Sequence, residues 1–291
     1  MHKFLKAIGF HNISSEKAWL ELLGDAEERF TGYERIALEE EIDFCELRKV
    51  CGVSIGICSY GLIGEDEIYS REYYLPYFEG SGVTSYADII VEHRSDKRAY
   101  VGICEDAKVG VSLIFHLLNG IEYAKEFHAG NIPKSSTSVT LSGLACSGTV
   151  LFPVMKSSQQ VQESREESRN RMMLLSAARE GNAEAIESLT MDDIDTYSEV
   201  SRRLMHEDVY SIVDTYFMPY GVECDQYSIL GEILDIDTVE NKLTGEVIDV
   251  FTLEVNELQF DVCVPAEKVT GEPEIGRRFK ANIWLQGKIN F

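Results

Sequence analysis

The sequence predicts an α+β protein with a mainly antiparallel N-terminal sheet domain and a few helices, a central helical segment, and a small C-terminal β-barrel. Three observations predict this arrangement. Short apolar runs punctuated by glycine fill residues 34–156, a polar stretch with little β-branching follows at 157–180, and apolar residues alternate with polar ones near the end of the chain. The predicted domains are 1–156, 157–221 and 222–291.

The first domain begins with a helix at 15–23, where apolar residues have helical spacing and Ser14 or Ser15 provides the cap. A helix is also expected at 121–128. The spacers between the apolar runs are too short for repeated crossover helices, which favours antiparallel pairing. The expected strands are 53–58, 89–92, 100–104, 109–118, 138–141 and 149–155.

The central segment is predicted to be helical. Residues 157–180 are rich in Gln, Glu, Ser and Arg and indicate a solvated connector helix, which Gly181 ends in the left-handed conformation. A second helix is expected at 183–189. Thr190 is expected to cap a third, with Asp193 in the capping-box position, and Asp208 to cap a fourth.

The last segment contains the clearest strands. Apolar residues occupy every second position at 258–264 and again at 279–285, and further strands are expected at 227–236 and 246–255. Asn256 and Glu257 have the length of a tight hairpin turn. Short strands bury little surface as an open sheet, whereas a closed barrel removes the edges. An OB-like or SH3-like barrel is therefore predicted.

Charge and cysteine content limit the possible partners. The net charge is −23, and no segment offers the basic patch that nucleic acids or anionic membranes require. A protein partner or a small neutral or cationic ligand remains open, as does the oligomeric state. The seven cysteines form no CxxC pair, and the apolar stretches are too short to span a bilayer, so a cytoplasmic protein is expected.

Several segments resemble a family of uncharacterised bacterial proteins that is catalogued as a domain of unknown function. The resemblance covers nearly the whole chain and implies no activity, cofactor or catalytic residue. The segments that carry it are VGVSLIF at 109–115, DTYS at 195–198, VYSIVDTYFMPYG at 209–221, CDQYSILG at 224–231, GEPEIG at 271–276 and IWLQG at 283–287.

No motif specifies catalysis, a cofactor or a metal. The glycines lack phosphate-loop spacing, and the histidines lack the spacing of metal ligands. Cys104 with His93 or His116 is a conceivable nucleophile–base pair, although a core position for Cys104 is the better interpretation. No metal and no cofactor are therefore expected, and catalytic residues stay unknown.

Aromatic residues give the remaining candidates for ligand binding or interaction. Four of them lie close together in one segment, namely Tyr73, Tyr74, Tyr77 and Phe78. The fifth, Trp284, lies on the polar side of its strand, where it either covers the barrel against the helical segment or is an exposed contact.

Three functions are consistent with these observations. The first is a non-enzymatic binding protein, favoured because catalytic signatures are missing. The second is a hydrolase or transferase whose site converges from distant residues within 34–156. The third is single-stranded nucleic-acid binding by the barrel, an analogy that the net charge opposes.

Overall fold

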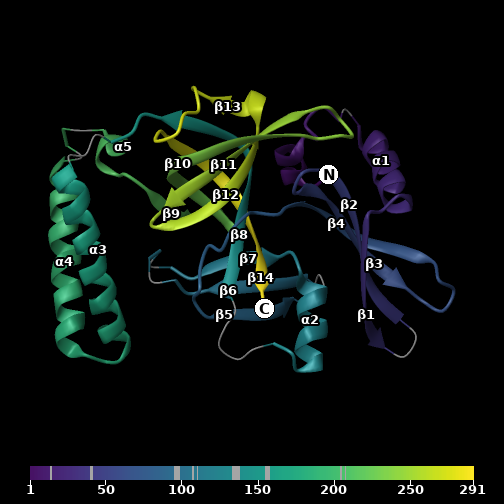
Figure 1. Cartoon of the computed structure of the whole chain (residues 1–291), viewed down its shortest axis with the longest axis horizontal. Coiled ribbons are helices and arrows are strands. Elements are labelled where there is room, and N and C mark those ends of the chain that lie inside the picture. Colours follow the sequence, from purple (N-terminus) through teal and green to yellow (C-terminus); the bar gives the residue numbers. More distant parts are fainter. Residues whose placement is uncertain are drawn as a thin grey trace.

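A computed structural model of the chain describes residues 1–13, 15–39, 42–94, 99–106, 108–109, 111–132, 138–154, 158–203, 205–206 and 208–291. The fold is α+β, as predicted. Figure 1 shows an antiparallel sheet at one end, a barrel in the middle that continues into further strands, and a helical hairpin that stands apart at the other end.

The N-terminal segment places a short 3-10 helix, η1 (Lys3–Ile8), between the first sheet and the barrel, and α1 (Glu16–Glu28) packs on the first sheet against β2. Ser15 caps α1 as expected, because its Oγ accepts a hydrogen bond from the Ala18 amide at 3.2 Å. Ser14 lies outside the described residues. Trp19 and Leu23, one turn apart, are the buried face of this helix.

The first sheet is antiparallel, with its four strands in the order β1-β2-β3-β4. Successive strands are joined by short connections, which suits antiparallel pairing. The Val53–Ser54 turn joins the second strand to the third, and Ser54 has a φ of 60°. The strands are β1 (Gly32–Glu39), β2 (Ile42–Gly52), β3 (Ile55–Ile63) and β4 (Tyr69–Phe78).

The barrel is closed and has five strands. Three of them form an antiparallel meander, β10 (Gln226–Glu240), β11 (Val247–Val255) and β12 (Leu258–Pro265). Asn256 and Glu257 join the last two with φ values of 50° and 62°, as a two-residue hairpin turn requires. Next, β12 pairs in parallel with β8 (Ser138–Leu151), and β14 (Arg278–Asn290) pairs with both β8 and β10 to close the ring.

One barrel strand comes from much earlier in the chain than the others. β8 lies inside the range 1–156 that the sequence assigns to the first domain, and the division into domains stays a prediction. The two strands expected at 138–141 and 149–155 are wrong as separate elements, because β8 is continuous. Its whole length pairs with β14, from Ser138 opposite Asn290 to Leu151 opposite Arg278, and this ladder holds the intervening glycines extended.

The barrel sheet continues beyond β14 into a short meander. β7 (Leu113–Leu117) pairs in parallel with β14 and antiparallel with β6 (Ala99–Cys104), which pairs with β5 (Ile89–Arg94). The helix α2 (Gly120–Ala129) follows and lies between β6 and β1, so it bridges the two sheets. Small elements complete the fold: β9 (Tyr216–Pro219), η2 (Ala266–Lys268) and β13 (Val269–Thr270).

The helical segment is a hairpin of α3 (Ser158–Arg179) and α4 (Ala183–Arg203), followed by the single turn α5 (Val209–Ile212). Gly181 has a φ of 87°, as predicted for the end of α3. The predicted break at Thr190 is wrong: its hydroxyl donates to the Ile186 carbonyl at 2.8 Å, a bond made within a continuing helix. Asn182 caps α4 instead, accepting from two backbone amides.

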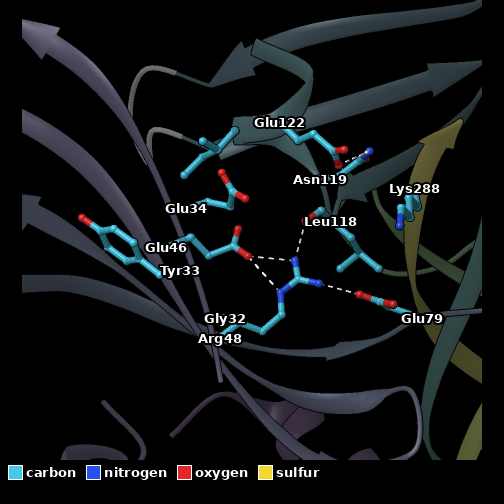
Figure 2. Close-up of a pocket in the computed structure, with 11 residues that line it drawn as sticks. Gly32, Tyr33, Glu34, Glu46, Arg48, Glu79, Leu118, Asn119, Glu122 and Lys288 are labelled. Atoms are coloured by element: carbon cyan, nitrogen blue, oxygen red, sulfur yellow. Dashed lines mark hydrogen bonds and ion pairs between the residues drawn. The ribbon is translucent and has the colours of Figure 1, made fainter. Parts of the chain in front are cut away.

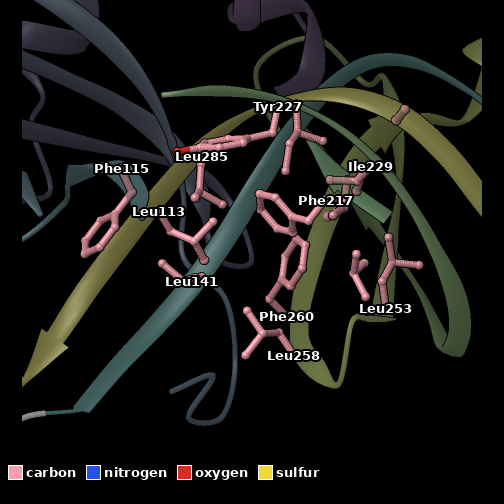
Figure 3. Close-up of a cluster of buried hydrophobic side chains, with 14 of the residues drawn as sticks. Leu113, Phe115, Leu141, Phe217, Tyr227, Ile229, Leu253, Leu258, Phe260 and Leu285 are labelled. Carbon is pink, nitrogen blue, oxygen red and sulfur yellow. The ribbon is translucent and has the colours of Figure 1, made fainter. Parts of the chain in front are cut away.

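Two large cores flank the barrel wall. The barrel interior holds one core, in which Phe217 meets Tyr227 edge-on with ring centroids 4.9 Å apart (Figure 3). The second lies outside the wall, where η1 and α1 pack against Leu144 and Trp284. The part of the wall that η1 and α1 cover is therefore apolar on both faces, whereas β10 and β11 elsewhere alternate buried apolar residues with polar ones.

Candidate functional site

The candidate site is a pocket of about 220 Å³ between the first sheet, the start of α2 and the end of β14. Figure 2 shows polar side chains from three separate parts of the chain converging on it. The residues that line it are Gly32, Tyr33, Glu34, Glu46, Arg48, Glu79, Leu118, Asn119, Ile121, Glu122 and Lys288.

Arg48 of β2 is at the centre of the pocket and is largely engaged by the protein. Its Nε and one terminal nitrogen donate to the Glu46 carboxylate at 3.0 and 2.8 Å. The same terminal nitrogen donates to the Leu118 carbonyl at 3.0 Å, and the other donates to Glu79. The guanidinium also lies over the Tyr77 ring, 4.9 Å from its centroid.

Glu46 is 4% exposed, so its charge depends on these contacts. It lies two positions before Arg48 on the same strand, and the period of two places both side chains on one face of the sheet. Burial by itself lowers the pKa of Arg48, but its electrostatic interactions with Cys58 and Glu46 outweigh that effect. The pKa of Arg48 is raised above its ordinary value, and the guanidinium stays charged.

Three further glutamates surround this pair. Glu34 of β1 forms an ion pair with Lys125 of α2, Glu79 with Arg48, and Glu122 accepts a hydrogen bond from the Asn119 amide at 3.3 Å. The lining has four glutamates against the two cations Arg48 and Lys288, and Lys125 outside the lining offsets one more, so one negative charge remains in excess. The pocket therefore favours positive charge.

Asn119 fixes the position of the pocket wall. Its side chain donates to the Ile289 carbonyl at 3.0 Å and accepts from the Ile289 amide at 3.1 Å. The neighbouring Leu118 amide donates to the Gly287 carbonyl at 2.8 Å. These bonds join the start of α2 to β14. Breaking them would leave buried backbone groups without hydrogen-bond partners, which is costly, so they hold the pocket wall in place.

The thiol beside Glu46 is not activated. Burial, and then the charge of Glu46, raise the pKa of Cys58 well above its ordinary value. The pair considered from the sequence is not brought together. Cys104 lies against Ser85, with its Sγ 3.8 Å from that hydroxyl, whereas His93 packs at a tilt against Tyr100 and His116 contacts Trp284.

The five aromatic candidates lie in the cores or between elements rather than on one surface. Tyr77 lies beneath Arg48, and Tyr73 stacks on Tyr60 with centroids 4.7 Å apart beside a second, much smaller cavity. Tyr74 packs against Trp19, and Phe78 is buried. Their role in binding stays a prediction.

Trp284 points outward from the barrel wall but is covered. Its indole N–H donates to Asp225 at 2.8 Å, and its ring packs against Phe4, His2 and His116. Of the two alternatives considered, the covering of the wall is the one found. The cover comes from η1, however, and not from the helical segment.

Sequence reasoning missed Glu46, Arg48 and the pocket around them. The available signal was a pair of opposite charges two residues apart, next to apolar neighbours in the run Phe44 to Leu47. Such a pair marks a charged spot on one face of a strand. Within the described ranges, no group of three or more His, Cys, Asp or Glu could hold a metal ion, and no helix is long and apolar enough to cross a membrane.

A closed barrel joined to a sheet and a helical hairpin, with a charged pocket beside α2, defines an α+β protein with a candidate small-ligand site. The chain belongs to the family described as a domain of unknown function, E. rectale gene description (DUF3881), whose model matches residues 5–287. No curated protein and no solved structure matches the chain.

Proposed function

We propose that this protein binds a small organic cation, such as an amine or a guanidine, in the pocket around Arg48. The observation that carries the proposal is the lining, where four glutamates face two cations. The net charge of −23 adds a long-range attraction that raises the local concentration of cations.

The hydrogen bonding of Arg48 supports a cation rather than an anion. A guanidinium has five N–H donors, and four of those of Arg48 already serve Glu46, Glu79 and the Leu118 carbonyl. An anionic ligand would have to displace a carboxylate of the protein. A cation can instead approach Glu122, whose hydrogen-bond donor is the neutral amide of Asn119.

The size of the pocket supports a small ligand. Its volume of about 220 Å³ is below the roughly 300–1,000 Å³ of sites for drug-sized molecules. A diamine or an amino-acid-sized guanidine suits that space. The Tyr33 ring at the edge offers a further contact for the alkyl part of such a molecule.

We infer binding without chemical conversion. The thiol of Cys58 beside the pocket has a raised pKa, and Glu46 and Glu79 are both held in ion pairs with Arg48. A cytoplasmic setting is part of the proposal and is supported by seven free cysteines, five of them buried. The organism in the family description supports a bacterial origin.

Isothermal titration calorimetry tests the proposal with 1,4-diaminobutane, spermidine and agmatine, and with succinate as the anionic control. We expect saturable binding of at least one cation and none of succinate, with affinity falling as salt increases. Absence of binding by all three cations at millimolar concentration would refute the proposal. Consumption of a bound cation would refute its non-enzymatic part.

A matched pair of variants locates the site. Glu122→Gln removes one pocket charge without touching Arg48, and we expect affinity to fall by about tenfold or more, as for the loss of one charge-assisted contact. Glu223→Gln removes the same charge from the exposed loop before β10. It should leave affinity unchanged, and equal losses in both variants would point to non-specific attraction.

A further inference from the structure

The hairpin of α3 and α4 has little packing with the rest of the protein. In Figure 1 it stands apart at the end opposite the first sheet. Among the described residues, each helix has extensive packing only with the other. Arg171 of α3 and Asp193 of α4 form an ion pair at 2.8 Å between them. A two-helix unit of this length gains most of its stability from the apolar faces that it buries.

α4 has two apolar faces, and α3 covers one of them. Ala185 and Leu189 are buried in the hairpin. Ile186, Met191 and Ile194 are 49%, 58% and 54% exposed. Viewed along the axis of α4, with 100° per residue, these three side chains lie within an arc of about 140°. The centre of this arc is about 150° from the direction of Ala185 and Leu189. The second apolar face therefore points away from α3.

α3 also has an exposed apolar residue, Met173, at 68% exposure. Exposed apolar residues that recur along one helix face mark an interaction site more often than scattered ones do. The pattern on α4 recurs at Ile186 and Ile194, which are eight residues apart and so lie on one side of the helix.

The charges of the two helices identify a fitting partner. By sequence, α3 has four arginines against three glutamates, so it is net positive in a strongly acidic chain. α4 has six carboxylates against two arginines. A partner that covers α4 should therefore be a helix with exposed apolar surface and a positive net charge, and the α3 of a second copy is net positive and exposes Met173.

We propose that two copies of the chain associate through this hairpin, with α4 of each copy against α3 of the other. A twofold axis gives each copy the same two contacts, as in most homodimers. The product is a four-helix bundle, in which the outward face of α4 becomes core. Contact of α4 with the same helix of the other copy is disfavoured by their like charge.

Sedimentation equilibrium of the full chain over about 1–100 µM tests the proposal. We expect a dimer in the wild type. The double variant Ile186→Glu, Ile194→Glu should dissociate at least 100-fold more readily, because two buried positions would then hold charges. Ile275→Glu, at a position 67% exposed in the loop before β14, is the matched control and should remain dimeric.

A wild type that is monomeric at 100 µM would overturn the proposal. A double variant that dimerises as tightly as the wild type would also overturn it, because the interface would then lie elsewhere. Circular dichroism distinguishes lost association from lost helix, so dissociation of the double variant supports the proposal only when its helix content is unchanged. A monomeric wild type overturns the proposal whatever the variant does. Binding of a cation in the Arg48 pocket is measured separately and does not depend on this result.

Discussion

Replacing His116 with phenylalanine should remove a specific part of the acid sensitivity of the fold. His116 is buried beside Trp284, and burial, followed by the positive charge of His2, lowers its pKa to about 4. The ordinary value is 6.5. The folded protein therefore holds this histidine neutral at pH values where the unfolded chain protonates it.

The sign and size of the effect follow from the two pKa values. Because the unfolded state binds more protons between pH 6.5 and 4, stability is lost as pH falls through this window. At pH 7 both states are neutral and the contribution is small. At pH 4.5 the difference costs the wild type about 2.5 kcal/mol of unfolding free energy.

Urea unfolding at pH 7, 5.5 and 4.5 measures this contribution. His116→Phe retains an aromatic ring against Trp284, and its stability should fall less than that of the wild type by about 2.5 kcal/mol between pH 7 and 4.5. His206→Phe, at an exposed position, is the control and should follow the wild type. Parallel pH profiles for wild type and His116→Phe would refute the reasoning.

Three further predictions concern stability at neutral pH. Arg48→Ala should cost about 3–5 kcal/mol in urea unfolding, because it leaves the Glu46 carboxylate buried without its cation, and a loss below about 1 kcal/mol would contradict this account. Gly148→Ala places a Cβ 2.1 Å from the Phe279 ring and should cost about 1–3 kcal/mol. Gly24→Ala, with open space in α1, should instead be neutral or stabilising by up to about 1 kcal/mol, and equal effects of the two substitutions would refute the steric argument. Asn241→Ala should lower the melting temperature by several degrees, because the buried amide donates to the Ile8 carbonyl at 2.7 Å and ties η1 to the β10–β11 turn, and an unchanged melting temperature would exclude that role.

The candidate site was beyond sequence reasoning because its parts converge only in three dimensions. Glu46 and Arg48 are neighbours on one strand, but Glu79, Leu118 and Lys288 come from other strands and from the start of α2. Each residue alone looks like an ordinary surface charge or turn residue. Only the register of the strands and the position of α2 show that they enclose a pocket.

The sequence by itself determined the α+β class, the barrel hairpins and the chain's place in its family. These follow from local rules: period-two alternation in β12 and β14, the two-residue turn at Asn256 and Glu257, and the cap at Ser15. Tertiary structure decided that β8 completes the barrel and that α4 continues through Thr190. Strand pairing between residues more than a hundred positions apart leaves no local signature, and packing of α4 against α3 outweighs the weak preference of one threonine for a helix end.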